Sequence, residues 1–230
     1  MTRIVPDNAR LEIKFNAHEL EADKIKQWLK LHPACFYTPY PDRWVNNVYF
    51  DTHHYHCYAE NLSGGSSRTK LRYRWYGQNP FPEKGILEVK CKRNYFGWKL
   101  RFSANKSPYE KESSWRDVQR NLIDQLTPEA RIWIESHPQP VIINRYYRMY
   151  FVSRDEKVRA TIDIKQQMFD QRYKPFPNIH HSVNLPKTLV LEFKFDRNDR
   201  SIASQIMQGL PLRVSRNSKY MIGVKSIHGY

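Results

Sequence analysis

The sequence predicts an α+β fold in which an antiparallel β-barrel encloses a basic tunnel and helices pack against the outside of the barrel. Three observations lead to this prediction. Many segments alternate apolar and polar residues, as strands with one buried face do. The polar face of several of these segments is cationic. Other segments repeat apolar residues at helical spacing and could cover the apolar faces of the strands.

The composition limits the possible partners. The chain has 230 residues, with 38 Lys and Arg against 23 Asp and Glu, for a net charge of +15. Such an excess attracts nucleic acid, an anionic membrane surface or a small polyanion without choosing among them. No Gly/Ser-rich or Pro-rich linker divides the chain, so we expect residues 1–230 to form a single domain.

Cysteine usage and hydropathy indicate a reducing, aqueous setting. Cys35, Cys57 and Cys91 are widely spaced, odd in number and without a Cys-x-x-Cys pair, which argues against a disulfide framework or a zinc ribbon. The sequence has no run of about 18 apolar residues, which a membrane-spanning helix would need. We therefore expect no membrane segment and a cytoplasmic protein.

Three histidines close together, His53, His54 and His56, raise the question of a metal site. Adjacent side chains on an extended segment diverge, so their ring nitrogens converge only with help from elsewhere. We expect a surface loop here.

The first elements follow from local patterns. A strand is predicted over residues 10–15, where apolar and charged residues alternate, and a helix from about His18 to Leu31, ended by His32-Pro33. A short strand is predicted over 46–51. A flexible Gly/Ser turn over 63–67 precedes the most basic segment of the chain.

That segment has a cation at every second position, namely Arg68, Lys70, Arg72 and Arg74. In a strand these four side chains share one face, and the opposite face is apolar with Leu71, Tyr73 and Trp75. Taken alone, the cationic face is more often the solvated side of an antiparallel sheet.

The same design recurs in later strands. The strands predicted over 86–92 and 98–102 place Lys90 and Lys92, and Lys99 and Arg101, on their polar faces. Between these strands and the next, a helix is predicted from Ser114 to Leu126, and a second begins at Thr127-Pro128, a cap residue followed by proline.

Strands resume over 144–151, 158–163 and 190–196, and helices are predicted over 201–208 and around 218–224. Alternation groups the polar side chains of these strands on shared faces: Tyr146 with Arg148, Arg159 with Asp163, and Glu192 with Lys194. Like charges repel across paired strands, so a sheet that collects cations on one face is costly unless a polyanion binds there. A barrel with those faces inward and helices over its apolar outside satisfies both requirements.

Short blocks in a fixed order connect the sequence with a known family. These blocks are Glu12-Ile-Lys14-Phe15, Val48-Tyr-Phe-Asp51, Arg72-x-Arg74-Trp-Tyr-Gly77, Leu87-Glu-Val-Lys90, Lys99-x-Arg101-Phe102, Tyr146-x-Arg148, Val158-Arg159, Leu191-Glu192-x-Lys194 and Ser218-Lys219-Tyr220. In them the chain resembles the polyphosphate polymerase (VTC) domain of the vacuolar transporter chaperone family. That family is a branch of the triphosphate tunnel metalloenzymes, also called CYTH-like proteins.

The resemblance implies an enzyme that transfers the γ-phosphoryl group of ATP to a growing inorganic polyphosphate chain and releases ADP. It implies a catalytic set that grips phosphates along the tunnel: Arg72, Arg74, Lys90, Arg148, Arg159 and Lys219. Lys14, Lys99, Tyr146 and Ser218 match further phosphate contacts, and Glu192 matches the carboxylate that holds Mn²⁺ or Mg²⁺. Arg68 and Lys70 lie on the face of Arg72, nearer the Gly/Ser turn, and we expect them at a tunnel mouth.

The implied roles suit the residue types. Arginine fixes a phosphate through bidentate contacts, whereas lysine is a mobile point charge. A carboxylate among these cations is most useful when it binds a hard divalent ion, although an ion pair between Glu192 and Lys194 is the structural alternative.

One departure distinguishes the chain within the superfamily. The related hydrolases and cyclases typically begin with Glu-x-Glu-x-Lys, whereas this chain has Arg10-x-Glu12-x-Lys14. A tunnel poorer in carboxylates should activate water less well, which favours elongation over hydrolysis. Glu12 could join the metal site or point outward.

Two alternatives stay open. One is a tunnel triphosphatase that acts on inorganic triphosphate or nucleotides. The other is a non-catalytic module that binds polyphosphate or nucleic acid. Tyr73, Trp75 and Tyr76 could in principle stack bases, but these aromatic residues mostly fall on the face opposite the cations, which favours a role in the core, and no nucleic acid is expected.

Overall fold

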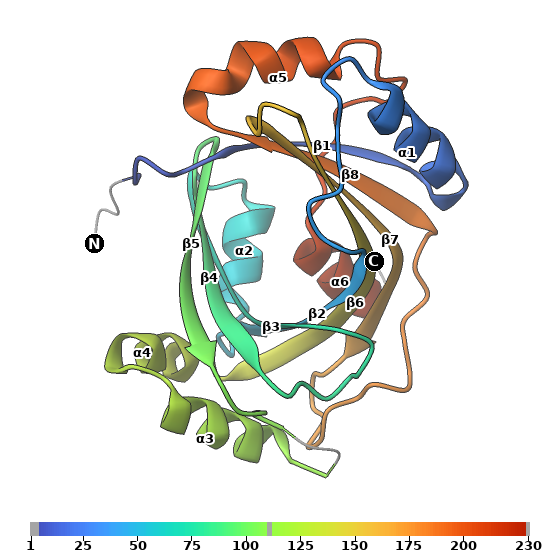
Figure 1. The fold of residues 1–230 in the computed structure, drawn as a ribbon. Helices are drawn as coiled ribbons and strands as arrows, with labels where there is room; N and C mark the ends of the chain where they lie inside the picture. The colour runs from blue at the N-terminus through green and yellow to red at the C-terminus, as the bar shows by residue number, and fades with distance from the viewer. Residues whose placement is uncertain (1–4, 110–111, 229–230) are drawn as a thin grey trace.

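The computed structural model describes residues 5–109 and 112–228, which are organised by one curled eight-stranded sheet (Figure 1). Neighbouring strands are antiparallel throughout, in the order β1-β8-β7-β6-β2-β3-β4-β5. The strands are β1 (Leu11–His18), β2 (Arg43–Asp51), β3 (Ser67–Tyr76), β4 (Gly85–Arg93), β5 (Phe96–Ala104), β6 (Gln139–Val152), β7 (Val158–Asp170) and β8 (Thr188–Phe195).

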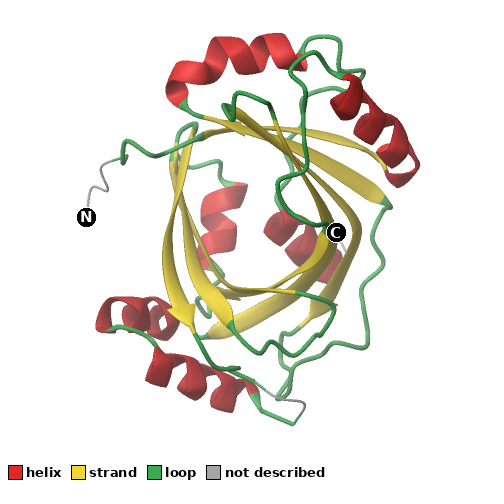
Figure 2. Ribbon diagram, in the orientation of Figure 1, coloured by secondary structure: helices red, strands yellow, loops and turns green. Residues whose placement is uncertain are grey.

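The two edges of the sheet meet at one point. Arg10, next to β1, and Gly97 of β5 exchange two backbone hydrogen bonds of 3.1 Å. The sheet therefore curls into a barrel, and the predicted α+β architecture with helices outside an antiparallel barrel is confirmed (Figure 2).

The helices cover the outside of the barrel in two groups and one of its ends in a third. α1 (Ala22–Leu31) and α5 (Arg200–Met207) pack over β1, β7 and β8, and α3 (Trp115–Gln125) and α4 (Pro128–Ser136) pack over β2 to β5. α2 (His56–Leu62) and α6 (Lys219–His228) pack together against β2, β6 and β7. No helix in the described part of the chain is long and apolar enough to cross a membrane.

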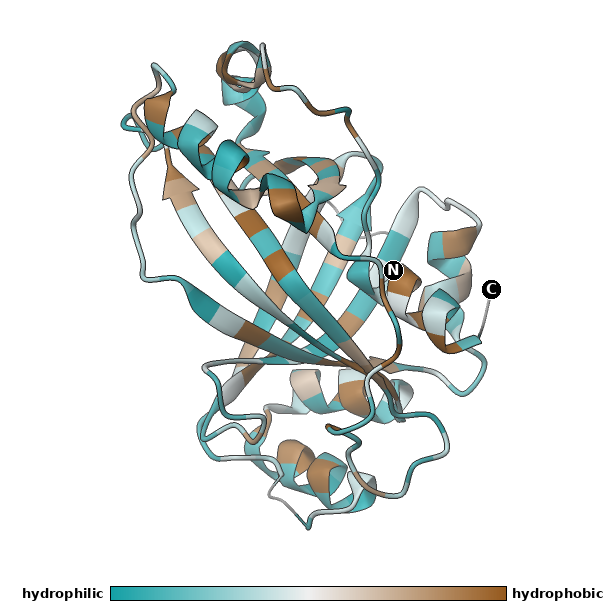
Figure 3. Cartoon of the chain, turned by 90° about the vertical axis from the view of Figure 1, so that its right-hand side faces the viewer, coloured by the Kyte–Doolittle hydropathy of each residue, from teal (hydrophilic) through white to brown (hydrophobic). Residues whose placement is uncertain are grey.

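The apolar cores lie outside the barrel because each strand alternates. Leu71, Tyr73 and Trp75 of β3 are at most 2% exposed and pack in one cluster with Trp115 and Leu122 of α3. Figure 3 shows this alternation as bands of hydrophilic and hydrophobic residues along the strands. The opposite faces, with their charged residues, point into the barrel.

The predicted start of α3 is confirmed in detail. The hydroxyl of Ser114 accepts a hydrogen bond from the backbone N–H of Asp117, and the carboxylate of Asp117 accepts one from the N–H of Ser114, both at 3.2 Å. This reciprocal capping box satisfies two N–H groups that the first turn leaves free.

The prediction of a surface loop around the histidines is partly wrong, because His56 begins α2. The buried carboxylate of Asp51 accepts hydrogen bonds from the N–H groups of Cys57 (2.9 Å) and Tyr58 (3.1 Å), and Tyr55 before them has a left-handed φ of 56°. An acid five residues upstream thus caps a helix that has no capping residue of its own. Within the described ranges, no three His, Cys, Asp or Glu side chains are grouped to hold a metal.

Candidate active site

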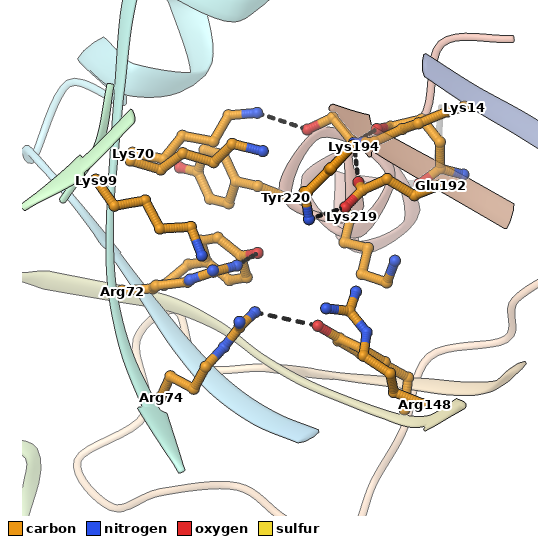
Figure 4. A pocket seen from close by; sticks show the side chains of 15 residues that line it. Lys14, Lys70, Arg72, Arg74, Lys99, Arg148, Glu192, Lys194, Lys219 and Tyr220 are labelled. Atoms are coloured by element: carbon orange, nitrogen blue, oxygen red, sulfur yellow. Dashed lines mark hydrogen bonds and ion pairs between the residues drawn. The ribbon is translucent and has the colours of Figure 1, made fainter. Parts of the chain in front are cut away.

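The barrel encloses a narrow cavity of about 80 Å³, here called the inner chamber (Figure 4). It adjoins a wider cavity of about 570 Å³, the outer mouth, which shares Arg74, Lys90, Lys99, Arg148, Glu192 and Lys194 with it. The predicted site residues other than Arg68 and Arg159 all line the inner chamber: Lys14, Lys70, Arg72, Arg74, Lys90, Lys99, Tyr146, Arg148, Glu192, Ser218 and Lys219.

The wall formed by β3, β4 and β5 is organised around Glu88. Its carboxylate, 3% exposed, accepts hydrogen bonds from Arg72 Nε at 2.8 Å and from Lys99 Nζ at 3.2 Å. Arg101 Nε lies at 3.4 Å and Arg74 Nη1 at 3.7 Å. Antiparallel pairing sets Glu88 directly opposite Arg72 and Arg101, so one carboxylate orients four cations.

The facing wall is formed by β6, β7 and the start of α6. Asp163, 1% exposed, accepts two parallel hydrogen bonds from Arg148, at 2.6 and 2.7 Å, and a third from Lys219 Nζ at 2.7 Å. The ring of Tyr146 lies under both cations, 5.2 Å from the Arg148 guanidinium carbon and 4.6 Å from Lys219 Nζ. Its hydroxyl accepts from Arg74 across the chamber at 3.1 Å.

The third wall alternates acids and lysines. On the paired strands β1 and β8, Glu12 lies opposite Lys194 and Lys14 opposite Glu192. Lys14 Nζ lies 2.7 Å from Glu12 and 3.1 Å from Glu192, while Lys90 of β4 reaches Glu12 at 3.2 Å and Lys194 pairs with Glu192. Glu12 thus points inward, which settles the orientation that the sequence left open.

The inner end of the chamber is closed by residues 217–220. Lys70 Nζ donates to the hydroxyl of Ser218 at 2.7 Å, and Lys14 Nζ donates to the carbonyl of Asn217 at 2.9 Å. Lys70 therefore lies at the inner end beside Ser218 and not at the outer mouth, contrary to the expectation that it stands at a tunnel mouth. Arg68, on the same strand, lines neither cavity, and Arg159 lies at the outer mouth with an exposed side chain.

Burial and neighbouring charges shift the pKa values of several groups in the chamber. Burial and the repulsion of Lys90 and Lys14 hold the pKa of Lys70 well below its usual value, and burial with Arg72 and Arg74 does the same to Lys99. Burial alone would raise the pKa of Asp163, but Arg148 and Lys219 lower it to about 2. The carboxylates stay ionised, and they compensate the charge of the buried lysines only in part.

The sequence predicted no role for Glu88, Asp163 and Tyr49, nor for Asn217 and Tyr220, which also line the inner chamber. Glu88 and Asp163 could have been found, because alternation placed each on the face of the predicted phosphate-binding cations. Tyr49 gave no such signal, since β2 is buried on both faces. Its hydroxyl accepts from Arg72 Nη1 at 3.3 Å, and Arg72 and Arg74 lower its pKa although burial alone would raise it.

The residues around Glu192 fit a hard divalent cation. Glu12 and Glu192 are close enough for their repulsion to oppose ionisation of Glu12. Thr161, opposite Glu192 on β7, has a buried hydroxyl oxygen with no hydrogen-bond partner in the described part of the chain. Two carboxylates and a hydroxyl are the oxygen ligands that Mg²⁺ and Mn²⁺ accept, with phosphate oxygens to complete the shell.

The fold and this cavity define a barrel protein with a cationic interior, and the comparisons with known proteins agree with this fold. The model of the VTC domain family matches residues 9–228, so the chain belongs to the VTC domain family. Subunit 2 of the vacuolar transporter chaperone complex of Saccharomyces cerevisiae is 27% identical over 190 residues. The match covers 68% of this chain and 23% of the yeast protein, so the chain spans about a quarter of the length of that relative.

Solved structures show the same fold at low identity. A putative adenylyl cyclase from Hippeastrum, described as having a dominant triphosphatase activity, has a TM-score of 0.51 at 11% identity and covers 96% of this chain and 95% of its own. A putative adenylate cyclase from Vibrio parahaemolyticus has a TM-score of 0.52 at 12% identity, with 94% and 98% covered. A chain of the Schizosaccharomyces pombe Mediator head module reaches 0.51 at 6% identity, with 90% and 97% covered.

Proposed function

We propose that the protein is a metal-dependent polyphosphate polymerase that transfers the γ-phosphoryl group of ATP to an inorganic polyphosphate chain and releases ADP. The observation that carries the proposal is the inner chamber, where guanidinium and ammonium groups from β1, β3, β4, β5, β6, β8 and α6 converge. Membership of the VTC domain family supports the same activity. ATP, polyphosphate and a cytoplasmic location are parts of this proposal.

The cavity contains the kinds of groups that phosphoryl transfer requires. Phosphoryl transfer depends mainly on alignment and on stabilising charge on the transferred group, so no protein nucleophile is needed. Arg72, Arg74 and Arg148 would align the phosphates, and Lys219 would stabilise the charge that moves to the leaving group. A divalent cation held by Glu192 and Glu12 would neutralise phosphate charge.

A phosphate chain would replace the carboxylates that now pair with these cations. Lys70, Lys90 and Lys99 all have lowered pKa values, for which burial is the largest cause. Bound phosphate oxygens would favour the charged amines again. Nucleic acid as the polymer fits poorly, since the cations lie inside a chamber of about 80 Å³.

The test is product analysis after incubating the purified protein with ATP and Mn²⁺. We expect ADP together with long polyphosphate, resolved on a gel, and no product when EDTA removes the metal. R72A and R148A should abolish polymer formation. ADP with free phosphate and no polymer would reject the polymerase.

A tunnel triphosphatase is the second candidate, and one observation favours it. Glu12 points inward near Glu192 and lines the outer mouth with it, so the barrel interior has more carboxylate than Arg10-x-Glu12-x-Lys14 led us to expect. Paired carboxylates can organise a metal and a water molecule. Release of phosphate from inorganic tripolyphosphate faster than polymer forms from ATP would favour this candidate.

A further inference from the structure

Three of the four tyrosines in the lining of the outer mouth gather around one arginine, Arg43. Tyr40 precedes β2, Tyr76 ends β3 and Tyr150 lies on β6, and all three line the wider cavity. Tyr40 is 55% exposed and Tyr76 42% exposed, so aromatic surface remains open to the cavity. Tyr40 and Tyr150 contact each other edge to face at 5.8 Å.

One arginine behind the rings holds them in place. The guanidinium carbon of Arg43 lies 4.1 Å from the ring centre of Tyr76 and 5.2 Å from that of Tyr150, and Arg43 Nε donates to the Tyr150 hydroxyl at 3.2 Å. The three rings line the cavity, whereas Arg43 does not. Arg43 is therefore a positioning residue that braces an aromatic surface facing the mouth.

Two of the rings lie two residues farther toward the outer mouth than Arg74 and Arg148, the arginines proposed to bind phosphate. Tyr76 follows Arg74 by two residues and Tyr150 follows Arg148 by two, so each tyrosine shares its arginine's face about 7 Å farther along the strand. Arg74 and Arg148 line both cavities. A ligand that reaches the chamber through the mouth thus passes from aromatic to cationic surface.

A polyphosphate chain has no planar group that could stack on aromatic rings, whereas a nucleoside triphosphate has a planar base at one end and phosphates at the other. We propose that Tyr40, Tyr76 and Tyr150 form a stacking platform for the nucleobase of the donor, with its phosphates directed inward past Arg74 and Arg148. This inference rests on the proposed function for the identity of the donor. It assigns the outer mouth to nucleotide selection.

The test compares two non-hydrolysable ligands, one with a nucleoside and one without. Calorimetry would measure binding of adenylyl imidodiphosphate and of diimidotriphosphate, in Mn²⁺, to the wild-type protein and to the variant Y40A/Y76A. Because stacking on one aromatic platform contributes about 5- to 150-fold in affinity, we expect a loss in that range for the nucleotide analogue. Binding of diimidotriphosphate should be unchanged, which also reports an intact fold.

Two controls separate stacking from other effects. Y40F/Y76F keeps the rings and should bind both ligands like the wild type, and Y173A removes a tyrosine that is 90% exposed and lines neither cavity. Equal affinities of the wild type and Y40A/Y76A for the nucleotide analogue, or an equal loss for both ligands, would overturn the platform. A selective loss in a protein that forms no polymer would keep the platform and reject the polymerase.

Discussion

The substitution Glu88→Gln tests whether the chamber is built for an anion that its own carboxylates only partly replace. Glu88 is 3% exposed and pairs with Arg72, Lys99, Arg101 and Arg74 at distances from 2.5 to 3.7 Å. Burial alone would raise the pKa of Glu88, but Arg72 and Arg74 hold it far below its usual range. Glutamine keeps the shape and removes the charge.

The expected cost follows from this geometry. Removing one partner of a buried ion pair destabilises a protein by about 3–5 kcal/mol, because the remaining charges are buried without compensation. For a chain of this size, each 1 kcal/mol lowers the melting temperature by about 2–4 °C, so E88Q should melt about 6–20 °C below the wild type. A bound phosphate chain would supply the missing negative charge, and most of the loss should then disappear.

Thermal unfolding with and without saturating diimidotriphosphate measures both quantities. Glu129→Gln is the matched control, since Glu129 is exposed on α4 outside the barrel. We expect a large deficit for E88Q alone, a small deficit with ligand, and no deficit for E129Q. An equal deficit for E88Q with and without the ligand would mean that phosphate does not reach these cations, and the chamber would then not be a phosphate site.

Three further predictions concern the same cavity. Since Arg148 and Lys219 lower the pKa of Asp163 from 3.8 to about 2, Asp163 should contribute about 2 kcal/mol of stability above pH 4 that is lost as the pH falls toward 2. Urea unfolding across this range should show a shallower decline for D163N than for the wild type, and parallel curves would contradict the pairing. Because the pKa values of Lys70 and Lys99 are lowered and phosphate would raise them, binding of diimidotriphosphate should take up protons, and the uptake should grow as the pH rises from neutral. Calorimetry in buffers of different ionisation enthalpy measures this uptake, and proton release would oppose the assignment. Arg74 donates hydrogen bonds to Asn47 at 2.8 Å and to Tyr146 at 3.1 Å, a fixed geometry that lysine cannot reproduce. R74K should therefore weaken diimidotriphosphate binding about tenfold or more in the same titration. Unchanged affinity would argue against an orienting role for Arg74.

Much of the fold could be predicted because alternation in the strands is a local property of the sequence. Each cation of β3 stands two positions from the next, so the face shared by Arg72 and Arg74 follows without knowledge of the rest of the chain. The capping box at Ser114 is equally local. The lengths of β6 and β7, which reach from Gln139 to Val152 and from Val158 to Asp170, exceed the predicted ranges because a register shift near Arg145 interrupts the pattern.

What escaped prediction depends on contacts between distant segments. Asp51 caps α2 locally, but its buried position depends on Tyr220, 169 residues away, whose hydroxyl donates a hydrogen bond to Asp51 at 2.5 Å. The direction of Glu12 depends on Lys90, which a different strand brings across the barrel. The aromatic surface braced by Arg43 combines a loop and two strands.

A crystal structure with bound diimidotriphosphate and Mn²⁺ would show where a phosphate chain binds. We expect phosphorus density inside the barrel, in contact with Arg72, Arg74, Arg148 and Lys219, and a metal ion beside Glu192. Density on the outside of the barrel, with these side chains still paired to Glu88 and Asp163, would contradict this expectation.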